Sequence, residues 1–177
     1  MNKKLLAIAF GSLFCAAAAN AADSSAVLDI TGTVTQHAEE CVYSVPATVT
    51  VNSTIDSIGM QDVQGSWNNA ASMPIFISDA VPGGPSACYG KVAIYLHGQA
   101  DTAKGNVLAN TDVSETAAKG VGIAMALANG QVLTPDGATF TPSTSVENIN
   151  FYQVQLSGQK AEPGTVQSNL TIDFVRL

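Results

Sequence analysis

The last thirty residues of the chain, from Asn148 to Leu177, constrain its fold more than any other stretch. Aromatic and β-branched residues are concentrated between Ile149 and Leu156, which is the composition of a β-strand. Between Val166 and Phe174 apolar and polar residues alternate, and this period of two also predicts a strand. One face of that second strand carries three apolar residues: Leu170, Ile172 and Phe174. The segment therefore predicts two strands around a turn, as in the last part of a β-sandwich.

The first 21 residues have the pattern of a secretory signal peptide. Lys3 and Lys4 precede an apolar run from Leu5 to Ala19, and small residues at the end of the segment suit a signal peptidase. The run is too short for a membrane-spanning helix, and no later segment is long and apolar enough to be one. We therefore expect removal of residues 1–21 during export and no membrane insertion of the mature chain.

The expected mature chain is strongly acidic. The whole sequence has seven basic and fourteen acidic residues, and two of the basic residues lie in the signal segment. Nucleic acids and anionic membrane surfaces attract basic patches, so we expect neither as a partner. About 156 residues remain after cleavage, which is enough for one domain with a two-layer core.

Two cysteines, Cys41 and Cys88, belong to the expected mature chain. In the oxidising environment of an exported protein, such a pair most simply forms one disulfide. A catalytic or metal-binding pair is the alternative, but the two residues form no Cys-x-x-Cys motif and have no histidine or acidic cluster at ligand spacing. We therefore predict a Cys41–Cys88 disulfide.

The sequence contains no nucleophile elbow, zinc-protease motif, phosphate-binding loop or dinucleotide fingerprint. Its two histidines, His37 and His97, are far apart, and its acidic residues are scattered singly. We therefore expect no enzymatic activity, no metal site and no cofactor.

Other stretches predict further short strands. Residues 73–78 (MPIFIS) and 91–97 (KVAIYLH) are rich in β-forming residues, and apolar residues alternate with small ones over residues 120–127. Asn129-Gly130 then predicts a two-residue hairpin turn. Trp67 lies in a loop-like stretch, where we expect it to be a packing residue. Short strands separated by turn residues indicate an all-β domain.

Several of these stretches resemble one known family. The order F-Y-x-V-x-L, P-G-T-V and L-T-I-D-F over residues 151–174 resembles the C-terminal signature of chaperone–usher fimbrial subunits, the type 1-like pilins. Near the expected mature start, Ile30-Thr-Gly-Thr-Val34 resembles the motif that opens the pilin domain. The spacing of the two cysteines and the G-V-G-I at residues 120–123 are similar to pilins as well.

The resemblance implies an immunoglobulin-like β-sandwich that lacks its last strand and is completed by a donor strand. Residues 31–177 would be the pilin domain, and residues 22–30 the N-terminal extension that acts as donor strand. Leu170, Ile172 and Phe174 would line the groove that receives such a strand. The donor residues that enter a groove would be those on the even-numbered face: Ala22, Ser24, Ala26, Leu28 and Ile30.

The partners implied by the resemblance are a periplasmic pilus chaperone, an outer-membrane usher and other pilin subunits. The implied location is a fimbria, reached by export through the periplasm to the cell surface, where it supports bacterial adhesion. The chain departs from the family pattern at its end, because residues 175–177 follow the aromatic Phe174, whereas pilins usually end one residue after it.

Two other functions stay open at the level of sequence. One is a minor, single-domain tip subunit that binds host glycans as an adhesin, with Trp67, Tyr89 and Tyr95 as its aromatic residues. The other is an unrelated periplasmic β-sandwich that is complete without a partner.

Overall fold

The computed structural model describes residues 41–79 and 88–177 of the chain. The predicted signal peptide (1–21) and N-terminal extension (22–30) lie outside this part. Its regular elements are ten β-strands and two short 3₁₀ helices within the described ranges. The strands are β1 (Cys41–Ser44), β2 (Gly59–Met60), β3 (Ala71–Asp79), β4 (Val92–Gly98), β5 (Leu108–Ala109), β6 (Val121–Leu127), β7 (Val132–Leu133), β8 (Asp136–Phe140), β9 (Val146–Gln155) and β10 (Leu170–Arg176). The 3₁₀ helices are η1 (Ile55–Ser57) and η2 (Gln64–Ser66).

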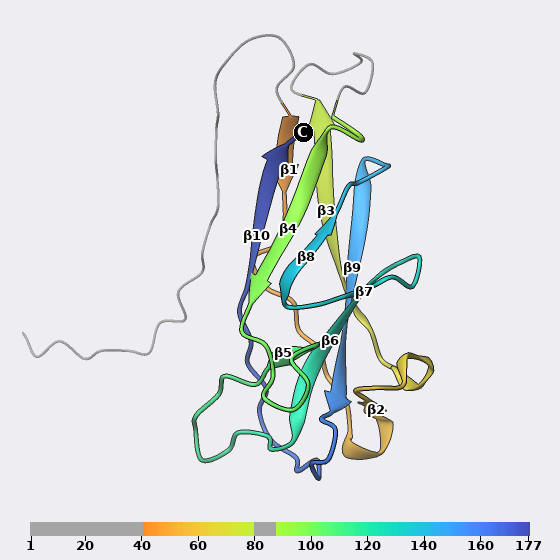
Figure 1. Ribbon diagram of the computed structural model, residues 1–177. Helices are drawn as coiled ribbons and strands as arrows, with labels where there is room; N and C mark the ends of the chain where they lie inside the picture. The colour runs from red at the N-terminus through yellow and green to blue at the C-terminus, as the bar shows by residue number, and fades with distance from the viewer. Residues whose placement is uncertain (1–40, 80–87) are drawn as a thin grey trace, which may run out of the picture.

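Two sheets form the domain (Figure 1). The larger has the order β1-β3-β9-β6-β5, with β2 paired to β9 and β7 paired to β6, and the smaller has the order β10-β4-β8. Side chains of both sheets meet in one core, which includes Met73, Ile75, Ile77, Ile94, Leu96, Met125, Leu127, Ile149 and Phe151. Because apolar side chains of each sheet face those of the other, the molecule is an all-β sandwich, as predicted.

Most predicted strands are present, with small changes at their ends. Residues 73–78 lie in β3, residues 91–97 largely in β4, and residues 121–127 form β6. The hairpin after β6 differs from the prediction, because the N–H of Leu127 donates to the carbonyl of Gln131 and leaves three residues in the loop. Gly130 has a φ of 87° there, a left-handed conformation that glycine adopts without strain and that a three-residue hairpin loop requires.

The two C-terminal strands differ from the prediction in their partners. β9 lies inside the larger sheet between β3 and β6, whereas β10 lies at the edge of the smaller sheet beside β4. The connection after β9 therefore crosses from one sheet to the other, and the last strand begins at Leu170 rather than at Val166. The crossing lets the apolar faces of both strands enter the same core from opposite sides.

Part of the outer face of the larger sheet is covered by the chain itself. Ala124 of β6 and Val154 of β9 belong to a second, smaller core, and Trp67 and Tyr152 pack against it. The rings of Trp67 and Tyr152 lie 5.5 Å apart between centroids. The indole Nε1 of Trp67 donates a hydrogen bond of 2.9 Å to the carbonyl of Met60. Trp67 is therefore a packing residue, as the sequence predicted.

A buried polar network connects the loops that cover this face. Asp101 and Gln61 are both buried, and the amide Nε2 of Gln61 donates to Oδ2 of Asp101 at 3.0 Å. The Asp101 carboxylate also accepts hydrogen bonds from three backbone N–H groups within residues 103–107. Oε1 of Gln61 accepts the backbone N–H of Ser157 at 2.8 Å. The network joins three segments that are far apart in sequence.

We expect Asp101→Asn to lower the free energy of unfolding by about 2 kcal/mol, because an amide leaves donors of the network without an acceptor. Burial has the largest effect on the pKa of Asp101 and raises it, but the backbone and Gln61 donors together outweigh burial and lower the pKa. A carboxylate with a lowered pKa stabilises the folded state above its unfolded pKa of about 3.9, and this contribution is lost as the pH falls through the folded value. Urea unfolding should therefore separate parent and variant at neutral pH and bring them together in acid.

The matched control is Asp56→Asn, since Asp56 is an exposed residue of η1. Its free energy of unfolding should change by no more than about 0.5 kcal/mol. An Asp101→Asn variant as stable as this control at neutral pH would contradict a structural role for the network.

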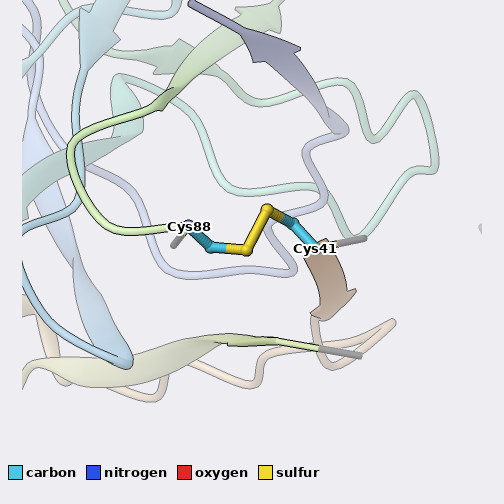
Figure 2. The surroundings of a disulfide bond; sticks show 2 residues. All are labelled: Cys41 and Cys88. Carbon is cyan, nitrogen blue, oxygen red and sulfur yellow. A yellow bond between two sulfur atoms is a disulfide. The ribbon is translucent and has the colours of Figure 1, made fainter. Parts of the chain in front are cut away.

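A disulfide joins Cys41, the first residue of β1, to Cys88, which lies shortly before β4 (Figure 2). The two Cα atoms are 5.7 Å apart and the residues are 47 positions apart in sequence. The predicted pairing is therefore present. It attaches β1, a short edge strand of the larger sheet, to the chain that enters the smaller sheet.

Replacing both cysteines with alanine should lower the free energy of unfolding by about 4 kcal/mol, the chain-entropy value for a loop of this length. The amount of folded subunit recovered from the periplasm measures this effect. Peptide mapping of the parent without reductant should find Cys41 and Cys88 linked, and free thiols at both positions would contradict the pairing.

Candidate functional site

The edges of the two sheets meet along one side of the sandwich. β1 is an outer strand of the larger sheet, and β10 is an outer strand of the smaller one. Figure 1 shows β1 and β10 next to each other, and the ring of Tyr43 on β1 stacks on the ring of Phe174 on β10. This side of the sandwich is where a further strand could be added.

Apolar side chains line both sides of this meeting point. At the start of the described chain, odd-numbered residues other than the exposed Ala47 are partly buried and pack against the main core: Cys41, Tyr43, Val45, Val49 and Val51. On β10, Leu170, Ile172 and Phe174 are also partly buried against that core. None of these side chains is closed off from solvent, in contrast to Ile94 and Leu96 of the neighbouring β4. We call these two rows, residues 43–51 and residues 170–174, the open edge.

The backbone of β10 is oriented toward the open edge at the same residues. The N–H of Leu177 donates to the carbonyl of Lys91 at 2.8 Å, in continuation of the β10–β4 register. Successive residues of an antiparallel strand direct their N–H and C=O groups to alternate sides. Odd-numbered residues of β10 therefore direct these groups to β4, and Leu170, Ile172 and Phe174 direct theirs away from it.

The aromatic pair lies at one end of the open edge. The ring centroids of Tyr43 and Phe174 are 4.3 Å apart, with 15° between the ring planes. Burial of Tyr43 is the largest effect on its pKa and raises it, while the positive charge of Arg176 acts in the opposite direction. The pair connects the two sheets at the end where β10 finishes and β1 begins.

The structure brings together part of the site that the sequence predicted. The three predicted groove residues, Leu170, Ile172 and Phe174, all lie on the core-facing side of β10. The predicted donor residues, Ala22, Ser24, Ala26, Leu28 and Ile30, lie outside the described residues. Sequence reasoning missed the opposite row, residues 43–51, although their period-two pattern was visible, because the pattern does not say which strand they face.

Other residues considered for chemistry form no comparable site. His97 contacts Asp136 and Asp173 at 3.4 and 3.5 Å on the outer face of the smaller sheet. Residues 41–79 and 88–177 contain no group of three or more histidine, cysteine or acidic residues that could hold a metal ion. Within the same ranges, no helix has the length and apolar character needed to cross a membrane.

An apolar sheet edge whose backbone groups point outward is a surface to which another chain can add a strand. The sequence is 32% identical over 160 residues to the fimbrial subunit type 1 of Salmonella typhimurium. The aligned region covers 85% of this chain and 83% of that protein. The chain therefore belongs to the fimbrial subunit family. No model of a known protein family matches the sequence.

The fold is shared with a solved pilus rod subunit. The crystal structure of the P pilus rod subunit PapA matches with a TM-score of 0.53 and 14% identity, over 84% of this chain and 100% of that chain. The P pilus adaptor subunit PapF matches with a TM-score of 0.44 and 18% identity, over 77% of this chain and 95% of that chain. By its family, this chain is a structural subunit of a fimbria that is exported to the cell surface.

Proposed function

We propose that this subunit polymerises by donor-strand exchange, in which residues 22–30 of one subunit add a strand beside β10 of the next. The observation that carries the proposal is the open edge. There, Leu170, Ile172 and Phe174 combine side chains packed on the core with backbone groups directed away from β4. A strand placed at this edge would gain main-chain hydrogen bonds and would cover partly exposed apolar surface.

The pattern of the N-terminal extension fits such a strand. At a period of two, its even-numbered residues would face the core of the neighbour and its odd-numbered residues would face water. Leu28 and Ile30 are the large apolar residues of the even face, and Asp23 and Asp29 lie on the odd face. The same alternation continues beyond residue 30 through Gly32 and Val34. In this proposal residues 1–21 are the signal peptide and residues 31–177 the pilin domain.

Before assembly the open edge needs a temporary cover. Unpaired backbone groups beside apolar side chains favour aggregation, so a single subunit would not stay soluble with this edge exposed. We infer that a periplasmic chaperone lends a strand to the same edge and that an outer-membrane usher receives the complex. The subunit itself then has a structural role and no catalytic one.

The test compares the parent with a chain from which residues 22–29 are deleted, each purified with its chaperone. Parent complexes mixed together should form a ladder of oligomers on a gel. The truncated chain alone should stay monomeric, because it can accept a strand but cannot donate one. Added to the parent, it should shorten the ladder, because each oligomer that contains it ends there. Oligomers of the truncated chain as long as those of the parent would contradict the proposal.

A further inference from the structure

Three apolar side chains form an exposed group on the outer face of the larger sheet. Phe76 of β3 is paired directly with Ser44 of β1 on one side and with Val146 of β9 on the other. Val42 lies two residues before Ser44 on the same face of β1. Val42, Phe76 and Val146 are 50%, 47% and 37% exposed. We call these three residues the outer patch.

The outer patch differs from the rest of the same face. Farther along β6 and β9, the chain covers the sheet with Trp67 and with the loop that contains Val107, where the second small core forms. At the outer patch the side chains face solvent instead, and their strand partners Ser44 and Ser78 are small and uncharged. In the expected mature chain, which has fourteen acidic and five basic residues, an uncharged apolar area is one where two copies can approach with little repulsion.

The position of the outer patch indicates which molecule covers it. The part of the chain that precedes the described structure joins it at Cys41, next to Val42. If residues 22–30 lie in a neighbouring subunit, only ten residues connect that subunit to Cys41, and they span at most about 36 Å. The start of β1, the end of β3 and the C-terminus of β10 lie at the same end of the sandwich (Figure 1). The neighbour that receives the donor strand is therefore held close to the outer patch.

We propose that the outer patch is a second contact between adjacent copies of this subunit in the fimbria. The inference rests on the proposed donor-strand assembly, which supplies the tether. Three side chains bury far less than the roughly 1,200–2,000 Å² of a stable interface, so free subunits do not associate through them. A short tether raises the effective concentration of the neighbour to about millimolar, which is enough to populate a weak contact. The contact therefore forms only in the polymer, where it restricts the angle between adjacent subunits.

The test places the photo-crosslinking residue benzoylphenylalanine at position 76, where it replaces another aromatic side chain. Irradiated fimbriae should give covalently linked subunit pairs, whereas the irradiated chaperone–subunit complex should give none. Benzoylphenylalanine in place of Val113, a residue that is 99% exposed, is the control and gives the yield of crosslinks from random collisions. Val42→Thr together with Val146→Thr should reduce the yield of linked pairs from position 76, because the apolar area shrinks.

Yields from position 76 no greater than those from position 113 would overturn the inference, and so would linkage of position 76 only to proteins other than this subunit. Failure of the parent to form any fimbria would instead count against donor-strand assembly. The two results are separate, because oligomer formation is scored on gels before irradiation.

Discussion

Phe174→Asp should abolish capture of the subunit by its chaperone and lead to degradation of the chain in the periplasm. Phe174 stacks on Tyr43 across the two sheets and packs against the main core. The substitution removes this stack and places a carboxylate beside Ile172 on the same face, at a cost of about 3 kcal/mol or more. Domains of this size are stable by only about 5–15 kcal/mol, so the loss is a large fraction of the total. The amount of subunit that copurifies with the chaperone from periplasmic extracts measures the effect.

Val175→Asp is the matched control, because it introduces the same charge on the next residue of β10. Val175 is 46% exposed and lies on the opposite face of the strand from Phe174. We expect the control to be captured at nearly the level of the parent. If Phe174→Asp were also captured and assembled at normal levels, Phe174 would not line an edge that receives a strand.

Leu28→Asp should give a subunit that folds with its chaperone but does not donate to the next subunit. In the proposed donor strand Leu28 is one of the two large apolar residues on the face that enters the neighbour. Its burial should contribute about 1.5–3 kcal/mol to each junction, and a carboxylate at this position would add a desolvation cost. Mixing purified chaperone–subunit complexes and following oligomers on gels over time measures the loss.

The control for this experiment is Asp29→Ser, since residue 29 lies on the opposite face of the same segment and should face water. It should polymerise at the rate of the parent. Equal rates for Leu28→Asp and the parent would show that residues 22–30 are not the donor.

The open edge illustrates how much of the site the sequence could predict. Alternation along the last strand identified Leu170, Ile172 and Phe174 as one apolar face, because alternation depends only on residues close together in the chain. The opposite row, which includes Tyr43, is also alternating, but Pro46 interrupts it and no local signal connects it to the last strand. The contact between Tyr43 and Phe174 joins residues about 130 positions apart, and sequence pattern alone carries no information on such pairs.

Partner choice is the second place where sequence and structure differ. Residues 149–156 and the last strand were expected to lie around one turn, whereas the structure places β9 and β10 in different sheets. Both arrangements have the same local pattern of apolar and polar residues. The choice between the two arrangements depends on which strand has a free edge along which the last strand can pair. In the structure, all seven residues of β10 pair with β4.

By itself, the sequence determined the elements whose causes are local. The strand at residues 121–127 follows from side-chain alternation and the strand at residues 73–78 from its β-forming residues. A turn at Gly130 follows from the freedom of glycine, although its loop has three residues instead of the expected two. The sequence also predicted the Cys41–Cys88 disulfide, because the expected mature chain has only these two cysteines to pair. Only the tertiary structure decided that β1 and β10 border one open edge, and that Gln61 and Asp101 share a buried network. These features join segments distant in sequence, and their stability depends on the whole set of strand pairings rather than on any single stretch.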